Sequence, residues 1–214
     1  VLTADHGGQD IPERRRLQGV SGAARVDAKL TAKDVGAAVG AQLGLKGPIL
    51  YGEGSFGDMY VDRALSPANQ ARAKAAAVAA FKAHPQVETV FTKEQLAATP
   101  SPTSSPDQWS LIEKGRASFD AERSGDFVVL LKRDVTPIAD TTRYAATHGS
   151  PWDYDRRVPI LFWRRGMPHT LRNDSIETVD IMPTLAAAIG LAVDQKAIDG
   201  KCLTGVSTIN CPAR

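Results

Sequence analysis

The 214-residue sequence has little cysteine, few aromatic residues, almost no excess of charge and no long apolar segment. Its 26 Lys and Arg residues against 24 Asp and Glu give a formal net charge of +2, too small to indicate nucleic acid as a partner. Wholly apolar runs such as Phe127–Leu131 and Ile160–Trp163 are short, and none approaches the ~20 residues that span a bilayer. With 43% hydrophobic and 23% charged residues, the composition is that of an ordinary globular domain.

The first residues lack an initiator methionine and the basic and apolar regions of a signal peptide. Instead the sequence opens on Val1-Leu2-Thr3-Ala4, which is typical of the end of a buried strand. We therefore expect the 214 residues to be part of a longer protein, whose upstream portion carries any signal peptide.

Helix and strand signals alternate along the chain. Thr31, Ser66 and Asp180 can begin helices that end near Leu43, Phe81 and Gly190. Capping boxes predict further helices, from Thr92 and from Ser110 to about Arg123. Strands are predicted over 48–51, 59–61, 87–91, 126–131 and 158–163. This alternation predicts an α/β fold around a mostly parallel sheet.

Two glycine- or arginine-rich motifs have plain structural interpretations. Gly52–Gly57 matches G-x-G-x-x-G, but the next residues have strand character, whereas a dinucleotide site needs a helix there, so we expect a glycine-rich hairpin. The Arg14–Arg16 triplet lacks interleaved aromatic residues and is predicted to be a solvated surface turn. No serine lies in a G-x-S-x-G elbow, which leaves an α/β-hydrolase triad without support.

The four histidines separate into two pairs. His84 lies at a predicted helix end and His169 in a polar loop, and both positions are explained without function. By contrast, Asp5-His6 and His148 lie beside glycines, near the ends of predicted strands, where sites form in α/β sheets. An Asp–His pair suits a borderline metal such as Zn²⁺. The alternative interpretation is an Asp that accepts backbone N–H bonds in a turn.

Three segments, in this order, resemble the alkaline phosphatase superfamily. Leu2–Gly7 (L-T-A-D-H-G) is similar to its T-A-D-H-G segment, and residues 147–160 (T-H-G-S-P-W-D-Y-D-R-R-V-P-I) resemble its late metal-histidine segment. Residues 179–191 resemble its last helix. The resemblance is strongest to bacterial enzymes with a threonine nucleophile, which are related to nucleotide pyrophosphatase/phosphodiesterases. It implies helices on both faces of the sheet, and a single domain portion over residues 1–214 that is incomplete at its N-terminal side.

The resemblance also implies a two-zinc phosphoryl-transfer site. Asp5 and His6 match ligands of the zinc that activates the nucleophile, and His148 matches a ligand of the other zinc. With two metals ~4 Å apart, the two imidazoles are expected within roughly 8 Å of each other. The nucleophile and the remaining ligands lie upstream of T-A-D-H-G in the family. We therefore expect no catalytic nucleophile in these 214 residues, incomplete zinc sites, and no activity from this portion alone.

The implied activity of the whole enzyme is hydrolysis of small phosphomonoesters through a covalent phospho-enzyme. The alternatives are a phosphodiesterase or nucleotide pyrophosphatase of the same superfamily, or a non-catalytic remnant of the fold that binds a ligand. The expected partners are the phosphate-ester substrate and the missing N-terminal portion, without nucleic acid and without a membrane span.

Cys202 and Cys211 are the only cysteines, and their even number and close spacing favour a disulfide. Reduced thiols in a cytosolic protein are the alternative. A metal site is disfavoured because no histidine or third cysteine lies nearby in the sequence. A disulfide indicates a periplasmic or extracellular location.

Overall fold

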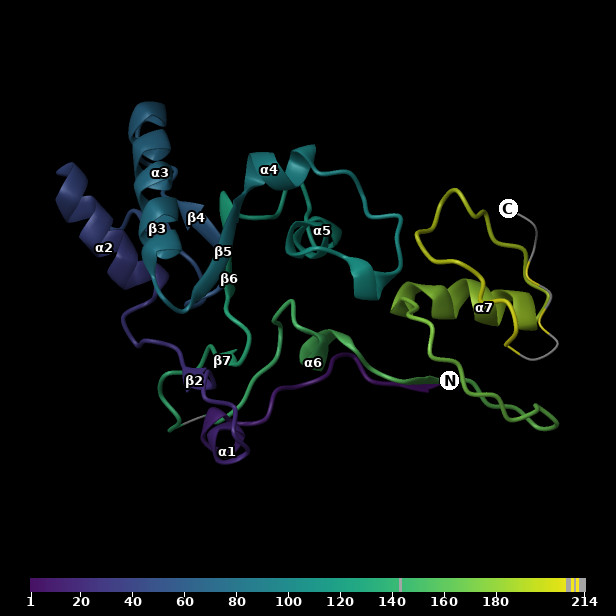
Figure 1. Cartoon of the computed structure of the whole chain (residues 1–214). Coiled ribbons are helices and arrows are strands. Elements are labelled where there is room, and N and C mark those ends of the chain that lie inside the picture. The colour runs from purple at the N-terminus through teal and green to yellow at the C-terminus, as the bar shows by residue number, and fades with distance from the viewer. Residues whose placement is uncertain (143, 207–208, 210, 212–214) are drawn as a thin grey trace. The chain divides into compact units, whose positions relative to one another are not determined.

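The computed structural model describes residues 1–142, 144–206, 209 and 211 (Figure 1). The chain separates into two compact units. Unit 1 comprises Val1–Asp5, Thr103–Trp109 and Val158–Arg214, and unit 2 comprises His6–Pro102 and Ser110–Arg157. The expectation of one domain portion over residues 1–214 stays a prediction.

Unit 2 is built on a four-stranded sheet with the order β3-β4-β6-β5, in which every neighbouring pair is antiparallel. The expectation of a mostly parallel sheet is wrong here, although the α/β class is correct. The short turn 52–56 leads directly from β3 into β4, whereas a parallel pair needs a crossover of about a dozen residues or more. The glycine-rich segment is therefore the turn of a hairpin, as expected. The strands are β3 (Leu50–Tyr51), β4 (Gly57–Val61), β5 (Val87–Thr92) and β6 (Phe127–Leu131).

A second, two-stranded sheet in unit 2 pairs β2 (Ala24–Arg25) with β7 (Val135–Thr136) in parallel. The helix α1 (Pro12–Leu17) precedes β2 and contains the arginine triplet, so the predicted surface turn is wrong. Proline at the first helical position, which needs no backbone donor, starts this helix.

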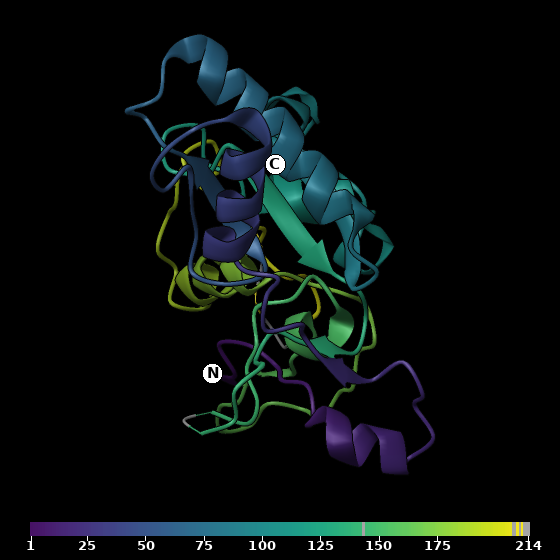
Figure 2. The same cartoon turned by 90° about the vertical axis from the view of Figure 1, so that its left-hand side faces the viewer.

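Helices α2 (Ala32–Leu43) and α3 (Pro67–Ala83) pack together over one face of the four-stranded sheet (Figure 2). Their starts follow from local chemistry, because the hydroxyls of Thr31 and Ser66 accept hydrogen bonds from backbone N–H groups in the first turn. Gly44 ends α2 in the left-handed conformation, with φ 68°, that favours glycine.

The other face of the sheet is approached by α4 (Lys93–Ala98) and α5 (Leu111–Ala117). Val90 belongs to the core under α2 and α3, so the next residue, Phe91, points to the opposite face, toward Gly115 of α5. Helices therefore lie on both faces, as expected. Helix α5 ends before the predicted Arg123, because the Asp120 carboxylate accepts the backbone N–H groups of the two residues at 122 and 123 in a local turn.

The main core lies between the sheet and helices α2 and α3. Phe81 of α3 and Phe127 of β6 are both fully buried, with ring centroids 5.9 Å apart. At roughly 25 cal/mol per Å² of buried apolar surface, two such rings are a large share of the burial energy. Smaller buried side chains of the sheet and helices fill the space around them: Ile49, Met59, Val61, Ala73, Ala77, Val90 and Val129.

Unit 1 contains the antiparallel pair β1 (Leu2–Thr3) and β8 (Ile160–Leu161), and the helix α7 (Ile181–Ala188) after the short 3₁₀ helix Thr178–Asp180. The expectation that Leu2 ends a buried strand is wrong, since its side chain is 69% exposed. Cys202 and Cys211 form the predicted disulfide, with Cα atoms 5.6 Å apart.

The remaining short helices are Pro106–Gln108, a 3₁₀ turn in unit 1, and α6 (Asp153–Arg156) in unit 2. Among the described residues, none of the helices has the length and apolar character that crossing a membrane requires.

Candidate metal centre

His6 and His148, which are far apart in the sequence, lie against each other in unit 2. Their imidazole rings are stacked, with centroids 3.4 Å apart and planes inclined by 13°. Both residues are exposed. This confirms the expected separation of less than roughly 8 Å and presents two nitrogen donors side by side at the surface.

The His6 ring is oriented by its own chain. Its Nδ1 lies 2.6 Å from the Gly7 carbonyl oxygen, and a carbonyl can only accept, so Nδ1 carries the proton in this contact. In the neutral ring Nε2 then keeps its lone pair. Metal-binding histidines commonly use one nitrogen for the metal and donate the other N–H to a carbonyl in this way. The donor chemistry therefore fits Zn²⁺, which imidazole nitrogen binds readily.

The two histidine-bearing segments are held together by Asp155. The Gly7 N–H donates to the Asp155 carbonyl oxygen at 2.8 Å, and the Ser150 N–H donates to Asp155 Oδ2 at 2.8 Å. A side chain at position 7 would collide with the Tyr154 carbonyl oxygen, so only glycine allows this approach. Gly149, with φ 103°, likewise needs the freedom of glycine between His148 and Ser150.

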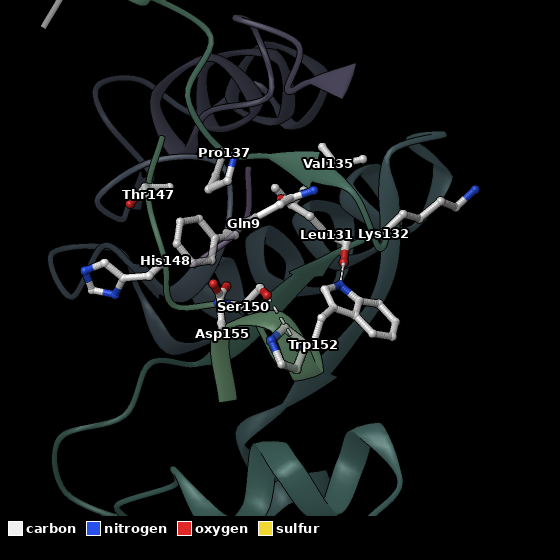
Figure 3. Close-up of a pocket in the computed structure, with 12 residues that line it drawn as sticks. Gln9, Leu131, Lys132, Val135, Pro137, Thr147, His148, Ser150, Trp152 and Asp155 are labelled. Atoms are coloured by element: carbon white, nitrogen blue, oxygen red, sulfur yellow. Dashed lines mark hydrogen bonds between the residues drawn. The ribbon is translucent and has the colours of Figure 1, made fainter. Parts of the chain in front are cut away.

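A small cavity of about 10 Å³ lies behind His148 (Figure 3). It has room for about one water molecule, and a phosphate ester does not fit. Figure 3 shows the His148 imidazole pointing outward, away from the indole of Trp152, whose Nε1 donates to the Leu131 carbonyl oxygen at 3.1 Å. The cavity is therefore a small space among the residues that pack around the His148 segment, and it is not the substrate site.

A half-buried polar cluster lies beside the segment that bears His148. Asp134 has φ 66°, an unusual value for a residue other than glycine, and its Oδ1 accepts from Arg15 Nη2 at 3.0 Å and Gln9 Nε2 at 3.3 Å. Its backbone N–H donates to the Tyr154 hydroxyl at 3.4 Å. Burial raises the pKa of the Tyr154 phenol above its usual value, so the group stays a neutral hydroxyl at neutral pH.

Sequence reasoning missed Asp155, Asp134 and Arg15. An aspartate close before a predicted strand and near a glycine-flanked histidine was an available signal for Asp155. Its partner Ser150 is five residues away, but its partner Gly7 lies far away in sequence. The two histidines were singled out by their glycine-flanked positions near strand ends and assigned to two zincs by resemblance, and the structure brings their rings together.

Asp5, the third predicted ligand, is exposed and belongs to unit 1, so its role stays a prediction. Within the described parts of the chain, no three His, Cys, Asp or Glu side chains gather as a metal-binding group. The predicted ligands divide between two zincs, and the expectation that these residues complete neither site stays a prediction. The carboxylate of Asp5 and the imidazoles of His6 and His148 are donors of the types that bind zinc, and each site would need further ligands.

The fold is that of alkaline phosphatases. The wild-type structure of the alkaline phosphatase PafA matches with a TM-score of 0.75 at 20% identity, over 96% of this chain and 37% of that one. A PafA variant matches with a TM-score of 0.73 over the same shares. At this identity the likeness establishes the fold class and no more.

Sequence comparison adds two relatives. Alkaline phosphatase PhoK of Sphingomonas sp is 51% identical over 206 residues, which are 95% of this chain and 37% of that protein. Alkaline phosphatase PhoD of Zymomonas mobilis subsp. mobilis is 45% identical over 221 residues, covering 100% of this chain and 38% of that protein. No family model matches the sequence. The chain is thus homologous to a portion of enzymes of the alkaline phosphatase superfamily, and spans about 37% of the length of the curated relatives.

Proposed function

We propose that this chain is the part of a zinc-dependent alkaline phosphatase that carries Asp5, His6 and His148. The whole enzyme would hydrolyse small phosphomonoesters through a covalent phospho-enzyme. Homology to named alkaline phosphatases supports the reaction class. The observation that carries the proposal is the contact between the His6 and His148 imidazoles, which come from the two segments expected to bind metal.

When bound, two zinc ions would stabilise negative charge on the attacking and leaving oxygens of an in-line displacement. His6 and Asp5 would supply nitrogen and oxygen donors to one ion, and His148 a nitrogen donor to the other. The Nδ1 contact of His6 with the Gly7 carbonyl favours the tautomer in which Nε2 carries the lone pair, which is the form of that nitrogen that binds a metal. The exposure of both rings leaves them accessible to a substrate in solution.

We place the protein in the periplasm or outside the cell. The Cys202–Cys211 disulfide supports this location, because disulfides persist in oxidising compartments.

The test is zinc-dependent hydrolysis of p-nitrophenyl phosphate by the native protein that contains this sequence. Chelation should abolish turnover and added zinc should restore it. His148→Ala should lower kcat/KM by at least about 10²-fold, whereas the control His169→Ala, at an exposed histidine of unit 1, should leave it unchanged. Activity that survives both chelation and His148→Ala would refute the proposal. Faster turnover of bis(p-nitrophenyl) phosphate than of the monoester would favour a phosphodiesterase instead.

A further inference from the structure

We propose that Asp155 is a positioning residue that sets the spacing of the two imidazoles by bonding to both histidine segments at once. The inference rests on the proposed function for its consequence in catalysis, but its structural content concerns the metal-free chain. The bonds of Asp155 to the two segments go to backbone groups and not to the rings. It acts through the backbone of the residues that follow each histidine.

The two bonds come from different parts of the same residue. The Asp155 main-chain oxygen accepts the Gly7 N–H, one residue after His6, at 2.8 Å. Its side-chain Oδ2 accepts the Ser150 N–H, two residues after His148, also at 2.8 Å. One residue therefore fixes two segments that are remote in the sequence, each within a few bonds of an imidazole.

Burying the Asp155 carboxylate costs free energy, so a residue that only filled this space would be expected to be neutral. Asp155 is only 6% exposed, and its Oδ1 has no hydrogen-bond partner among the described residues. A buried carboxylate is strongly disfavoured unless its oxygens are bonded, and a neutral side chain would fill the same volume at lower cost. An acceptor is nevertheless required at this place, because the Ser150 N–H would otherwise lose its partner.

The neighbouring residues restrict any substitute arrangement. Gly7 lies so close to the Tyr154 carbonyl that a side chain there would collide with it, and the Tyr154 hydroxyl accepts from the Asp134 backbone N–H. The Ser150 hydroxyl accepts the Trp152 N–H at 3.3 Å, so the Asp155 carboxylate remains the acceptor for the Ser150 N–H. On the C-terminal side of His148 the loop is thus held by the Asp155 carboxylate, while Arg25 Nη1 holds the loop on the other side by donating to the Ala145 carbonyl oxygen at 3.0 Å.

Asp155→Ala removes that oxygen and keeps the main chain, whereas Asp155→Asn keeps an amide oxygen that can accept from Ser150. A matched control is Asp180→Ala in unit 1, since Asp180 is a similarly buried aspartate whose carboxylate accepts two backbone N–H groups. The first readout is NMR of the metal-free protein, in which rings 3.4 Å apart give cross-relaxation between the His6 and His148 ring protons. The second readout is zinc affinity by calorimetry.

We expect Asp155→Ala to lose the ring-to-ring cross-relaxation and to weaken zinc binding by about 10- to 100-fold. Asp155→Asn and Asp180→Ala should keep both close to wild type. Unchanged cross-relaxation and affinity in Asp155→Ala would overturn the inference, as would an equal loss in Asp180→Ala. If Asp155→Ala does not fold, amide exchange in the wild type decides: the Gly7 and Ser150 N–H groups should be protected, and exchange at the rate of free peptides would overturn the inference.

The two proposals fail separately. If His148→Ala leaves zinc binding and hydrolysis intact, the proposed function fails, independently of the cross-relaxation result for the Asp155 variants. If His148→Ala abolishes both but Asp155→Ala changes neither the rings nor the affinity, only the positioning role of Asp155 fails.

Discussion

The two units are stabilised in different ways. Unit 2 contains the whole of the main apolar core, from Val26 to Val135, with Phe81 and Phe127 fully buried. Unit 1 exposes large apolar side chains, including Trp163 at 78% and Leu171 at 82%. The described part of unit 1 instead contains buried polar bonds and a disulfide.

The polar bonds of unit 1 join α7 to the segment after Gly200. Asp180 Oδ1 accepts the Lys201 N–H at 2.7 Å, and the Thr184 hydroxyl donates to the Asp180 carbonyl oxygen at 2.6 Å while accepting the Leu203 N–H at 2.9 Å. Thr184 is completely buried. Since such groups are costly to leave unpaired, each bond makes this local arrangement specific.

The largest expected difference between the units is in the response to losing an aromatic ring. Phe127→Ala should lower the free energy of unfolding by about 3–5 kcal/mol, because it leaves a cavity in the core of unit 2. Trp163→Ala in unit 1 should change it by less than about 0.5 kcal/mol, because the side chain is already in water. Urea unfolding followed by circular dichroism measures both. Equal losses would contradict the comparison.

The disulfide should be the next largest contribution, and it should be confined to unit 1. Its cysteines are 9 positions apart, so the chain-entropy model gives at most about 3 kcal/mol. Replacing both cysteines by serine should speed amide exchange around α7 and leave the amides of β6 unaffected. Thiol titration of the denatured, unreduced protein supplies the control. Two free thiols per chain would show that the bond is absent from the native protein.

Removing one buried hydroxyl tests the polar bonds directly. Thr184→Val leaves the Leu203 N–H without its acceptor, and should cost about 1–3 kcal/mol of local stability. The Leu203 amide should then exchange faster with solvent in NMR. Thr178→Val, at an exposed threonine before the same helix, is the matched control and should have an effect below about 0.5 kcal/mol. Equal exchange in the two variants would mean that the hydroxyl contributes nothing.

The smallest expected effect concerns acid and unit 2. Lys74 Nζ lies 2.6 Å from Glu94 Oε1, and this bond lowers the pKa of Glu94 from 4.5 to about 2. A carboxyl whose pKa is lowered on folding stabilises the fold above pH 4.5 and loses that contribution as the pH falls toward 2. Because Glu94 is 71% exposed, solvent screening limits the effect to below about 1 kcal/mol.

The matched pair for this prediction is Lys74→Met and Lys82→Met, two changes on the same helix. Lys74→Met should have a lower free energy of unfolding than wild type at pH 6, and this difference should disappear near pH 2. Lys82→Met should give no gap that depends on pH in this way. Urea titrations between pH 6 and pH 2 measure these differences. A difference in the free energy of unfolding between Lys74→Met and wild type that grew in acid would contradict the predicted pH dependence.

Features set by neighbouring residues were predictable from sequence. Thr31 and Ser66 cap their helices, and Thr92 forms a capping box with Gln95, because each bond spans only three residues. Strand direction was not predictable in this way, since the pairing of β6 with β4 and β5 joins segments that the local pattern does not relate. The same limit applies to the site. His6 and His148 were recognisable from their glycine-flanked positions and from the resemblance, whereas Asp155 is recognisable only through its bonds to Gly7 and Ser150 in the folded chain.

The most direct test of the central claim is zinc K-edge X-ray absorption of the zinc-loaded native protein. The account predicts nitrogen scatterers at about 2.0–2.1 Å with the multiple scattering of imidazole, reduced in His148→Ala and reduced further when His6 is also replaced. His169→Ala should leave the spectrum unchanged. A spectrum that was identical in the wild type and the double variant would contradict the assignment of His6 and His148 as zinc ligands.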